Sequence, residues 1–272
     1  MPLELPPDLL TAFHAAARLG HPDALNEALE ALAALPPIAA NASLSEGEVG
    51  RVLVPLGETL AVPTVAIEHL RDLQQPPLAA LRAVAAAALA VRYLRSLPAG
   101  ARDLARSAKD PRDEVRLALR LALRRHASQA PRRLLDLLTD WLTVAHPPRS
   151  PRQVAVALHT LPTLASAFPQ EALTLAAAHR HAEHPVTQKA LVTCLRELAQ
   201  QGLAEPVLAL LEQWAQAPST PLFVIGGTLS GRWALAYRER STAILDALEA
   251  RYGPRRPITN ARKALKRVAN GE

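Results

Sequence analysis

The chain has 272 residues, of which 49% are hydrophobic and only 3% aromatic, and its formal net charge is +6 at pH 7. The scarcity of the aromatic and β-branched residues that strands favour, together with only 11 glycines, argues against an all-β fold or a glycine-loop α/β fold. The 24 prolines in an Ala- and Leu-rich chain instead indicate many helices that begin at proline.

No apolar stretch reaches the ~18–20 residues that a membrane-spanning helix needs. Arg82, Arg92 and Arg95 interrupt the most Ala-rich segment. The first ten residues lack the basic start and the apolar run of a secretory signal peptide. The sequence therefore predicts a soluble, cytoplasmic protein that has no membrane partner.

In chain order, the sequence predicts a cap helix over 7–19 and an irregular helix pair over 22–35 and 44–61. Regular helix pairs follow from residue 63, with a step of about 35 residues between successive pairs. The first helices of these pairs begin near Pro63, Pro98, Pro131, Pro169, Ala204 and Glu239. The second helices, most of them headed by proline, cover 76–96, 111–127, 150–167, 184–201, 219–237 and 257–269.

A helix pair that recurs at this period cannot bury its apolar face alone, and stacked pairs share one continuous core. We therefore expect a single all-α domain over 1–272. Within it, residues 1–62 form an N-terminal cap and an irregular repeat, and residues 63–272 form the regular pairs. The predicted fold class is a right-handed α-solenoid of about six to seven helix pairs.

Residues 98–127 carry a sequence signature of their own. They contain a first helix, then Asp110-Pro111 at the turn, then Glu114-Val115-Arg116 opening the second helix. This stretch resembles a HEAT repeat of the armadillo-type solenoids. In that family the turn Asp and the Arg near the start of the second helix join adjacent repeats, and the resemblance assigns these roles to Asp110 and Arg116. It also implies that the second helices line the concave surface.

A second resemblance covers the C-terminal part of the chain. Gln188-Lys189-Ala190, followed by Leu195-Arg196-Glu197-Leu198-Ala199, is similar to a late helix of the HEAT-like alkylpurine DNA glycosylases. The segment 258–266 is similar to their closing helix. Those enzymes grip damaged DNA in a basic groove and use an Asp with neighbouring Trp residues. The helix over 76–96, which should supply these residues, has no acid and no Trp. The resemblance therefore implies DNA binding or shared ancestry without the catalytic pattern.

Positive charge is concentrated in one class of predicted helix. The net charge is −4 over residues 1–100, +6 over 101–200 and +4 over 201–272. The second helices carry 16 Lys and Arg against 3 Asp and Glu, whereas the first helices are nearly balanced. If the second helices line the inner surface, as the HEAT resemblance implies, that surface is strongly positive and suits an anionic ligand.

Four arginines of the helix over 111–127 recur every four residues and form one stripe. Like charges at this spacing repel by a few tenths of a kcal/mol per pair, so an anionic group opposite the stripe would explain it. The predicted nucleic-acid-binding residues are Arg82, Arg92, Arg112, Arg116, Arg120, Arg124, Arg152, Lys189, Arg196, Arg232, Arg262, Lys263, Lys266 and Arg267.

These features favour a non-enzymatic scaffold whose basic groove binds DNA or RNA through phosphates, which gives affinity without sequence recognition. The alternatives are an adaptor for an acidic protein, a solvated face with no anionic ligand, and a DNA base-excision enzyme. Tyr93, Trp233 and Tyr237 are candidates for base stacking, with core packing as the simpler role. No cofactor, metal or catalytic residue is predicted.

Three other groups of residues carry possible chemistry. His179, His181 and His184 lie close in sequence across a turn, but no cysteine or distant histidine pair completes a metal spacing, which favours an exposed polar turn. Cys194, the only cysteine, fits a small buried hydrophobe inside a helix. The glycines within 226–231 match neither a P-loop nor a nucleophile elbow, and they favour close helix packing.

Overall fold

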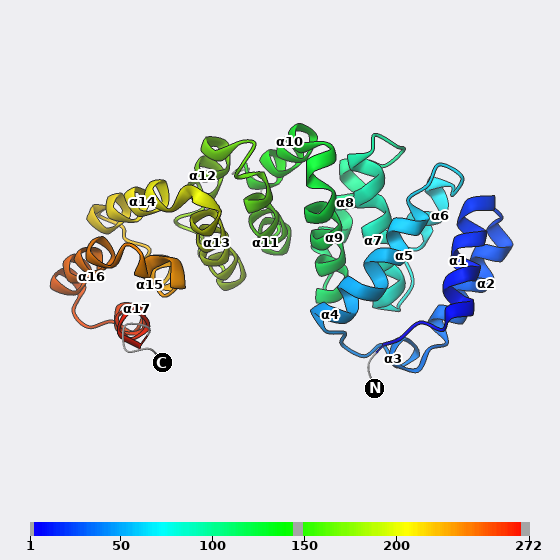
Figure 1. Cartoon of the computed structure of the whole chain (residues 1–272), viewed down its shortest axis with the longest axis horizontal. Helices are drawn as coiled ribbons and strands as arrows, with labels where there is room; N and C mark the ends of the chain where they lie inside the picture. Colours follow the sequence, from blue (N-terminus) through cyan, green and yellow to red (C-terminus); the bar gives the residue numbers. More distant parts are fainter. Residues whose placement is uncertain (1–2, 144–148, 268–272) are drawn as a thin grey trace. The chain divides into compact units, whose positions relative to one another are not determined.

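The computed structural model describes residues 3–143 and 149–267, except for the side chain of Arg267. The described residues form helices joined by turns and contain no strand, which confirms the all-α prediction (Figure 1). None of the described helices is both long and apolar enough to cross a bilayer. The chain divides into two compact units, Met1–Leu137 and Leu138–Glu272, and the division falls within α10.

The N-terminal unit is built from short and medium-length helices. They are α1 (Pro7–Leu19), α2 (Pro22–Ala33), α3 (Pro36–Ala39), α4 (Glu46–Glu48), the π-helical η1 (Val49–Leu53), α5 (Val54–Leu60), α6 (Ile67–Asp72), α7 (Ala79–Leu94), α8 (Ala101–Lys109), α9 (Asp113–His126) and η2 (Ala127–Gln129), followed by α10 (Pro131–Leu142).

The C-terminal unit is also built from short and medium-length helices. They are α11 (Pro151–Thr160), η3 (Leu161–Leu164), α12 (Pro169–Ala177), α13 (Pro185–Leu198), η4 (Ala199–Leu203), α14 (Ala204–Gln216), α15 (Leu222–Leu229), η5 (Arg232–Leu235), α16 (Arg238–Tyr252) and α17 (Arg256–Arg267).

Proline begins many of these helices, as predicted. It occupies the first turn of α1, α2, α11, α12 and α13, where its fixed φ fits and its missing N–H leaves no bond unmade. The cap helix is confirmed as α1, and four predicted second helices are confirmed as α7, α9, α13 and α17. The helix predicted over 150–167 is α11 only to Thr160 and continues as the 3-10 helix η3, and the helix predicted over 219–237 divides into α15 and the 3-10 helix η5. Residues 268 and 269, at the end of the last predicted helix, lie outside the described residues.

Helix α7 forms the centre of the N-terminal unit. It packs against both α5 and α9, and nearly all of its side chains are buried. Most of these side chains are alanines, so the backbones of the neighbouring helices approach closely while apolar surface leaves water. This packing leaves α7 little exposed surface for a ligand.

Gly57 lies where α5 approaches α7 closely. A Cβ atom there would lie 2.6 Å from both Ala87 Cβ and the Val84 carbonyl oxygen. We expect Gly57→Ala to lower the free energy of unfolding by about 1–3 kcal/mol in a denaturant titration, because the backbone of a buried helix does not yield easily. Gly47→Ala is the control, since its Cβ meets the flexible Arg51 guanidinium at 3.7 Å. Equal losses for the two variants would contradict this account.

In the C-terminal unit, α11, α13, α15 and α17 pack in series against one another (Figure 1). Helices α12, α14 and α16 form a second series that packs against the first. The buried indole of Trp214 on α14 contributes to the core between them. The first series carries most of the cations that the sequence singled out in this unit.

Candidate nucleic-acid interface

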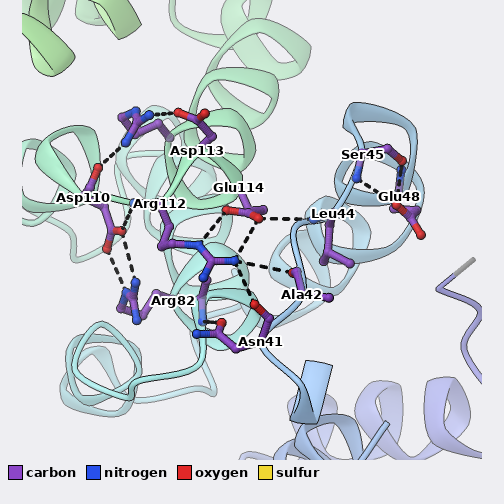
Figure 2. Close-up of polar contacts among 12 residues, drawn as sticks. Asn41, Ala42, Leu44, Ser45, Glu48, Arg82, Asp110, Arg112, Asp113 and Glu114 are labelled. Carbon is purple, nitrogen blue, oxygen red and sulfur yellow. Dashed lines mark hydrogen bonds and ion pairs between the residues drawn. The ribbon is translucent and has the colours of Figure 1, made fainter. Parts of the chain in front are cut away.

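The arginine stripe of α9 is paired with acceptors of its own unit. Arg112 donates to Glu114 through Nε at 3.2 Å and Nη2 at 3.1 Å, and to the Asn41 carbonyl at 3.0 Å (Figure 2). Arg116 bonds to the carbonyl of Asp110 and to the carboxylate of Asp113. The stripe is therefore not a row of unbalanced charges.

Residues in the C-terminal half of α9 are likewise paired, with carboxylates from the segment that contains α4 and α5. Arg120 Nη2 lies 3.3 Å from Glu46 Oε1. Arg125 and His126 both contact the Glu58 carboxylate, at 3.1 and 3.0 Å. Carboxylates from some 60 to 75 residues earlier in the chain thus take the position that the sequence analysis assigned to a ligand. Arg124, the fourth member of the stripe, is half-buried and also has a partner.

Arg82 is tied to the turn between α8 and α9. Its guanidinium forms a bidentate pair with Asp110, at 2.8 and 3.1 Å (Figure 2), and also donates to the Pro76 and Pro77 carbonyls. Only 13% of the Arg82 side chain and 11% of the Asp110 side chain are exposed. This pair links α7 to the turn between α8 and α9, and Arg82 is not a surface cation.

Arg92 lies in the core, where no phosphate could reach it. The residue is 2% exposed and donates to the carbonyls of Val62, Val65 and Pro98. Burial lowers the pKa of its guanidinium. The sequence placed Arg92 on a binding surface because a helical wheel does not show that neighbours cover α7 on nearly every side. We therefore leave Arg92 out of the interface.

Two glutamates of the N-terminal unit have lowered pKa values. Burial by itself raises the pKa of Glu114, but hydrogen bonds from Arg112 and from the Leu44 N–H outweigh it. Glu48 accepts from the Ser45 hydroxyl and the Ser45 N–H (Figure 2) and also from the Leu3 N–H, and these bonds lower its pKa to about 2. Both groups therefore favour the folded state only when ionised.

We expect the free energy of unfolding to fall as the pH is lowered from about 4.5 to about 2. The unfolded chain takes up protons on Glu48 and Glu114 near 4.5, whereas the folded chain resists until lower pH. Glu48→Gln should make this slope shallower in denaturant titrations across that window. Glu30→Gln, at an exposed position on α2, controls for the loss of one charge. An unchanged slope in Glu48→Gln would contradict the assignment.

The C-terminal unit presents its cations differently. Five predicted residues on α11, α13, η5 and α17 are exposed and have no carboxylate partner among the described residues. They are Arg152, Lys189, Arg232, Lys263 and Lys266. These five side chains are the predicted site residues that the structure leaves accessible to an anion, and we call them the exposed cation set.

Three other predicted residues of this unit stand apart from that set. Arg262 pairs with Asp246 at 2.5 Å and Glu249 at 2.6 Å on α16, and the hydrogen bond with Asp246 raises its pKa. Arg196 is half-buried and donates to the Gly227 carbonyl. The side chain of Arg267 lies outside the described residues.

The other candidates take part in packing and local hydrogen bonds. Burial lowers the pKa of His179, which bonds to the Leu142 carbonyl, and His184 accepts the Val186 N–H at the start of α13. Across the part of the chain that is described, no group of three His, Cys, Asp or Glu could hold a metal ion. Cys194 is buried, as predicted. The Tyr93 ring contacts the Arg133 guanidinium, 4.4 Å from the ring centroid.

The sequence pattern does not identify the carboxylates that pair with the arginines at and after the start of α9, namely Glu46, Glu58 and Glu114. A signal for them was present in the net charge of −4 over residues 1–100, which sits beside a net charge of +6 over the next hundred. Opposite charges in successive segments that pack together are expected to pair. Composition alone does not show which residues meet.

No protein-family model matches the chain, and no curated protein matches it either. The resemblances to HEAT repeats and to the alkylpurine glycosylases therefore rest on the residues quoted above. The fold class that the structure itself defines is all-α.

Proposed function

We propose that the chain is a non-enzymatic, cytoplasmic scaffold that binds nucleic acid through backbone phosphates. The observation that carries this proposal is the exposed cation set of the C-terminal unit. Four of its members come from α11, α13 and α17, which belong to one packed series, and Arg232 comes from η5; no described carboxylate neutralises them. Spaced lysines and arginines of this kind contact phosphates and release counterions, which gives affinity without sequence preference.

A polyanion fits this surface better than an acidic protein does. A protein interface needs an apolar centre within its polar rim. In the described part of the C-terminal unit, Val186 and Phe223 are the large hydrophobic residues that are exposed, at 42% and 44%. Two such residues make a small apolar contribution beside five charged side chains, so the adaptor function is the second candidate.

We further propose that the helices form a right-handed solenoid of six to seven HEAT-like pairs. The link between Arg82 on α7 and Asp110 before α9 supports this, because the turn Asp of a HEAT repeat joins adjacent repeats. The bond from Arg116 to the Asp110 carbonyl supports it as well. The single domain over 1–272 is part of the same proposal.

A salt titration of DNA binding tests the function directly. Fluorescence anisotropy with labelled duplex and single-stranded DNA should show binding at low salt and a linear fall of log K with log salt concentration. No binding of either DNA at low salt would overturn the proposal. Capture of an acidic protein by a chain that binds no nucleic acid would favour the adaptor function instead.

Base excision is the remaining alternative, and it needs a carboxylate beside the bound base. The carboxylates at the start of α9, Asp113 and Glu114, are both paired with arginines. An assay for the release of methylated bases from alkylated DNA distinguishes this activity from binding. We expect binding without release.

A further inference from the structure

Arg196 on α13 carries a charge that no described carboxylate balances. Its Nε and Nη2 both donate to one acceptor, the Gly227 carbonyl oxygen, with an Nε–O distance of 2.9 Å. Its Nη1 makes no hydrogen bond to the described residues. The side chain is half-buried, and burial lowers the pKa of the guanidinium. A partly desolvated cation without a counter-ion is a favourable place for an incoming anion.

A second, independent observation lies next to Arg196. Trp233 is only 8% exposed, and its indole Nε1–H is buried without an acceptor among the described residues. Buried donors are nearly always hydrogen-bonded, so an unpaired one needs an explanation. A ligand oxygen that supplies the missing acceptor is one such explanation.

Gly231 brings the two side chains together. A Cβ atom at this position would lie 3.0 Å from Trp233 Nε1 and 3.3 Å from Arg196 Cγ. The arginine stem and the indole edge therefore contact the same short stretch of backbone, and any larger residue at 231 would push them aside. The glycine therefore lets the stem of Arg196 and the Nε1 edge of Trp233 lie against the same residue.

Two exposed cations lie near this pair in the sequence. Lys189 lies seven residues before Arg196, on the same face of α13, and Arg232 immediately precedes Trp233. Both are exposed and have no carboxylate partner among the described residues. Their charges attract an anion toward Arg196.

We propose that Arg196 and Trp233 form a discrete site for one phosphate group. The proposal deepens the proposed function and rests on it: the exposed cation set holds the nucleic-acid backbone, and this site fixes one of its phosphates. The phosphate accepts from Arg196 Nη1. When the guanidinium turns away from the Gly227 carbonyl, the phosphate also accepts from the indole N–H. Two donors on a tetrahedral oxyanion favour phosphate over a halide ion.

The test uses the full chain with two probes, inorganic phosphate and a short DNA duplex, at constant ionic strength. Tryptophan emission should change on phosphate binding, because Trp233 lies at the site whereas Trp141 and Trp214 are 0% and 2% exposed. Calorimetry should show phosphate affinity about tenfold weaker in Trp233→Phe, which keeps a packed ring but loses the N–H. Arg196→Gln should weaken it further, and Arg196→Lys should restore part of the loss.

Arg238→Gln is the matched control, because it removes one exposed cation at the start of α16. Circular dichroism establishes that each variant is folded. Phosphate affinity that is the same in Trp233→Phe, Arg196→Gln and Arg238→Gln would overturn the site. Weakening of both phosphate and duplex binding by the two site variants supports a backbone phosphate as the ligand.

The two proposals can fail separately. If inorganic phosphate binds and depends on Arg196 and Trp233 while no DNA binds at any salt concentration, the site stands as one for a free phosphate and the nucleic-acid function is overturned. If the duplex binds and neither site variant alters its affinity, the nucleic-acid function stands and the discrete site is overturned.

Discussion

Replacing Asp110 with Ala is expected to lower the free energy of unfolding by about 3 kcal/mol. The substitution leaves the Arg82 guanidinium without its carboxylate, on a side chain that is only 13% exposed. It also removes the acceptor of the Arg112 N–H, which lies 2.9 Å from Asp110 Oδ1. A denaturant titration followed by circular dichroism measures the change.

The control for this prediction is Asp136→Ala. Asp136 pairs with Arg132 at 3.1 Å, but the two side chains are 61% and 72% exposed. Exposed pairs of this kind contribute between zero and about 1 kcal/mol. If both substitutions lowered stability equally, Asp110 would not have the linking role that the structure assigns to it. Asp110→Asn separates the effects of charge and shape, and it should lower the free energy of unfolding less than Asp110→Ala does.

The second large effect concerns nucleic-acid binding by α17. The double variant Lys263→Gln, Lys266→Gln removes two phosphate contacts. The slope of log K against log salt concentration should therefore become less negative by about two, since each contact contributes about 0.9 to that slope. Both lysines are exposed and have no carboxylate partner among the described residues, so their loss should leave stability nearly unchanged. Anisotropy titrations at several salt concentrations give the slope.

A double variant on α8 provides the comparison. Arg106→Gln with Lys109→Gln removes the same amount of charge from exposed positions outside the exposed cation set. If binding depended on net charge alone, the two double variants would have the same slope, and the assignment of the exposed cation set would be wrong. A slope that changes only in the α17 variant supports a localised surface.

The helices themselves were largely predictable from the sequence. Local effects decide where they begin, because proline suits the first turn and a regular spacing of Ala and Leu suits a buried face. The cap helix over 7–19 and the starts of α10, α12 and α14 agree with the predicted residues. These features depend on neighbours within a few positions, which the sequence displays directly.

The candidate site was only partly predictable. Arg116, Arg120 and Arg124 of the predicted stripe lie on α9, whereas Arg112 precedes the helix as its N-cap. The sequence could not show that Glu46 and Glu58 lie against α9, because they are separated from it by some 60 to 75 residues. The burial of Arg92 was not predictable for the same reason. Its hydrogen-bond acceptors are the carbonyls of Val62, Val65 and Pro98, which lie on other segments of the chain. Pairing and burial are properties of contacts between segments.

By itself, the sequence determined the helical fold class, the positions of most helices and the excess of cations on one class of helix. Those properties follow from residue type and local spacing, which govern φ, hydrogen bonding and amphipathic character. Only the tertiary structure decided which cations are neutralised, which are buried and which face solvent. A surface cation attracts an anionic ligand only when no carboxylate packs against it and neutralises it. Whether a carboxylate does so depends on where distant segments of the chain meet.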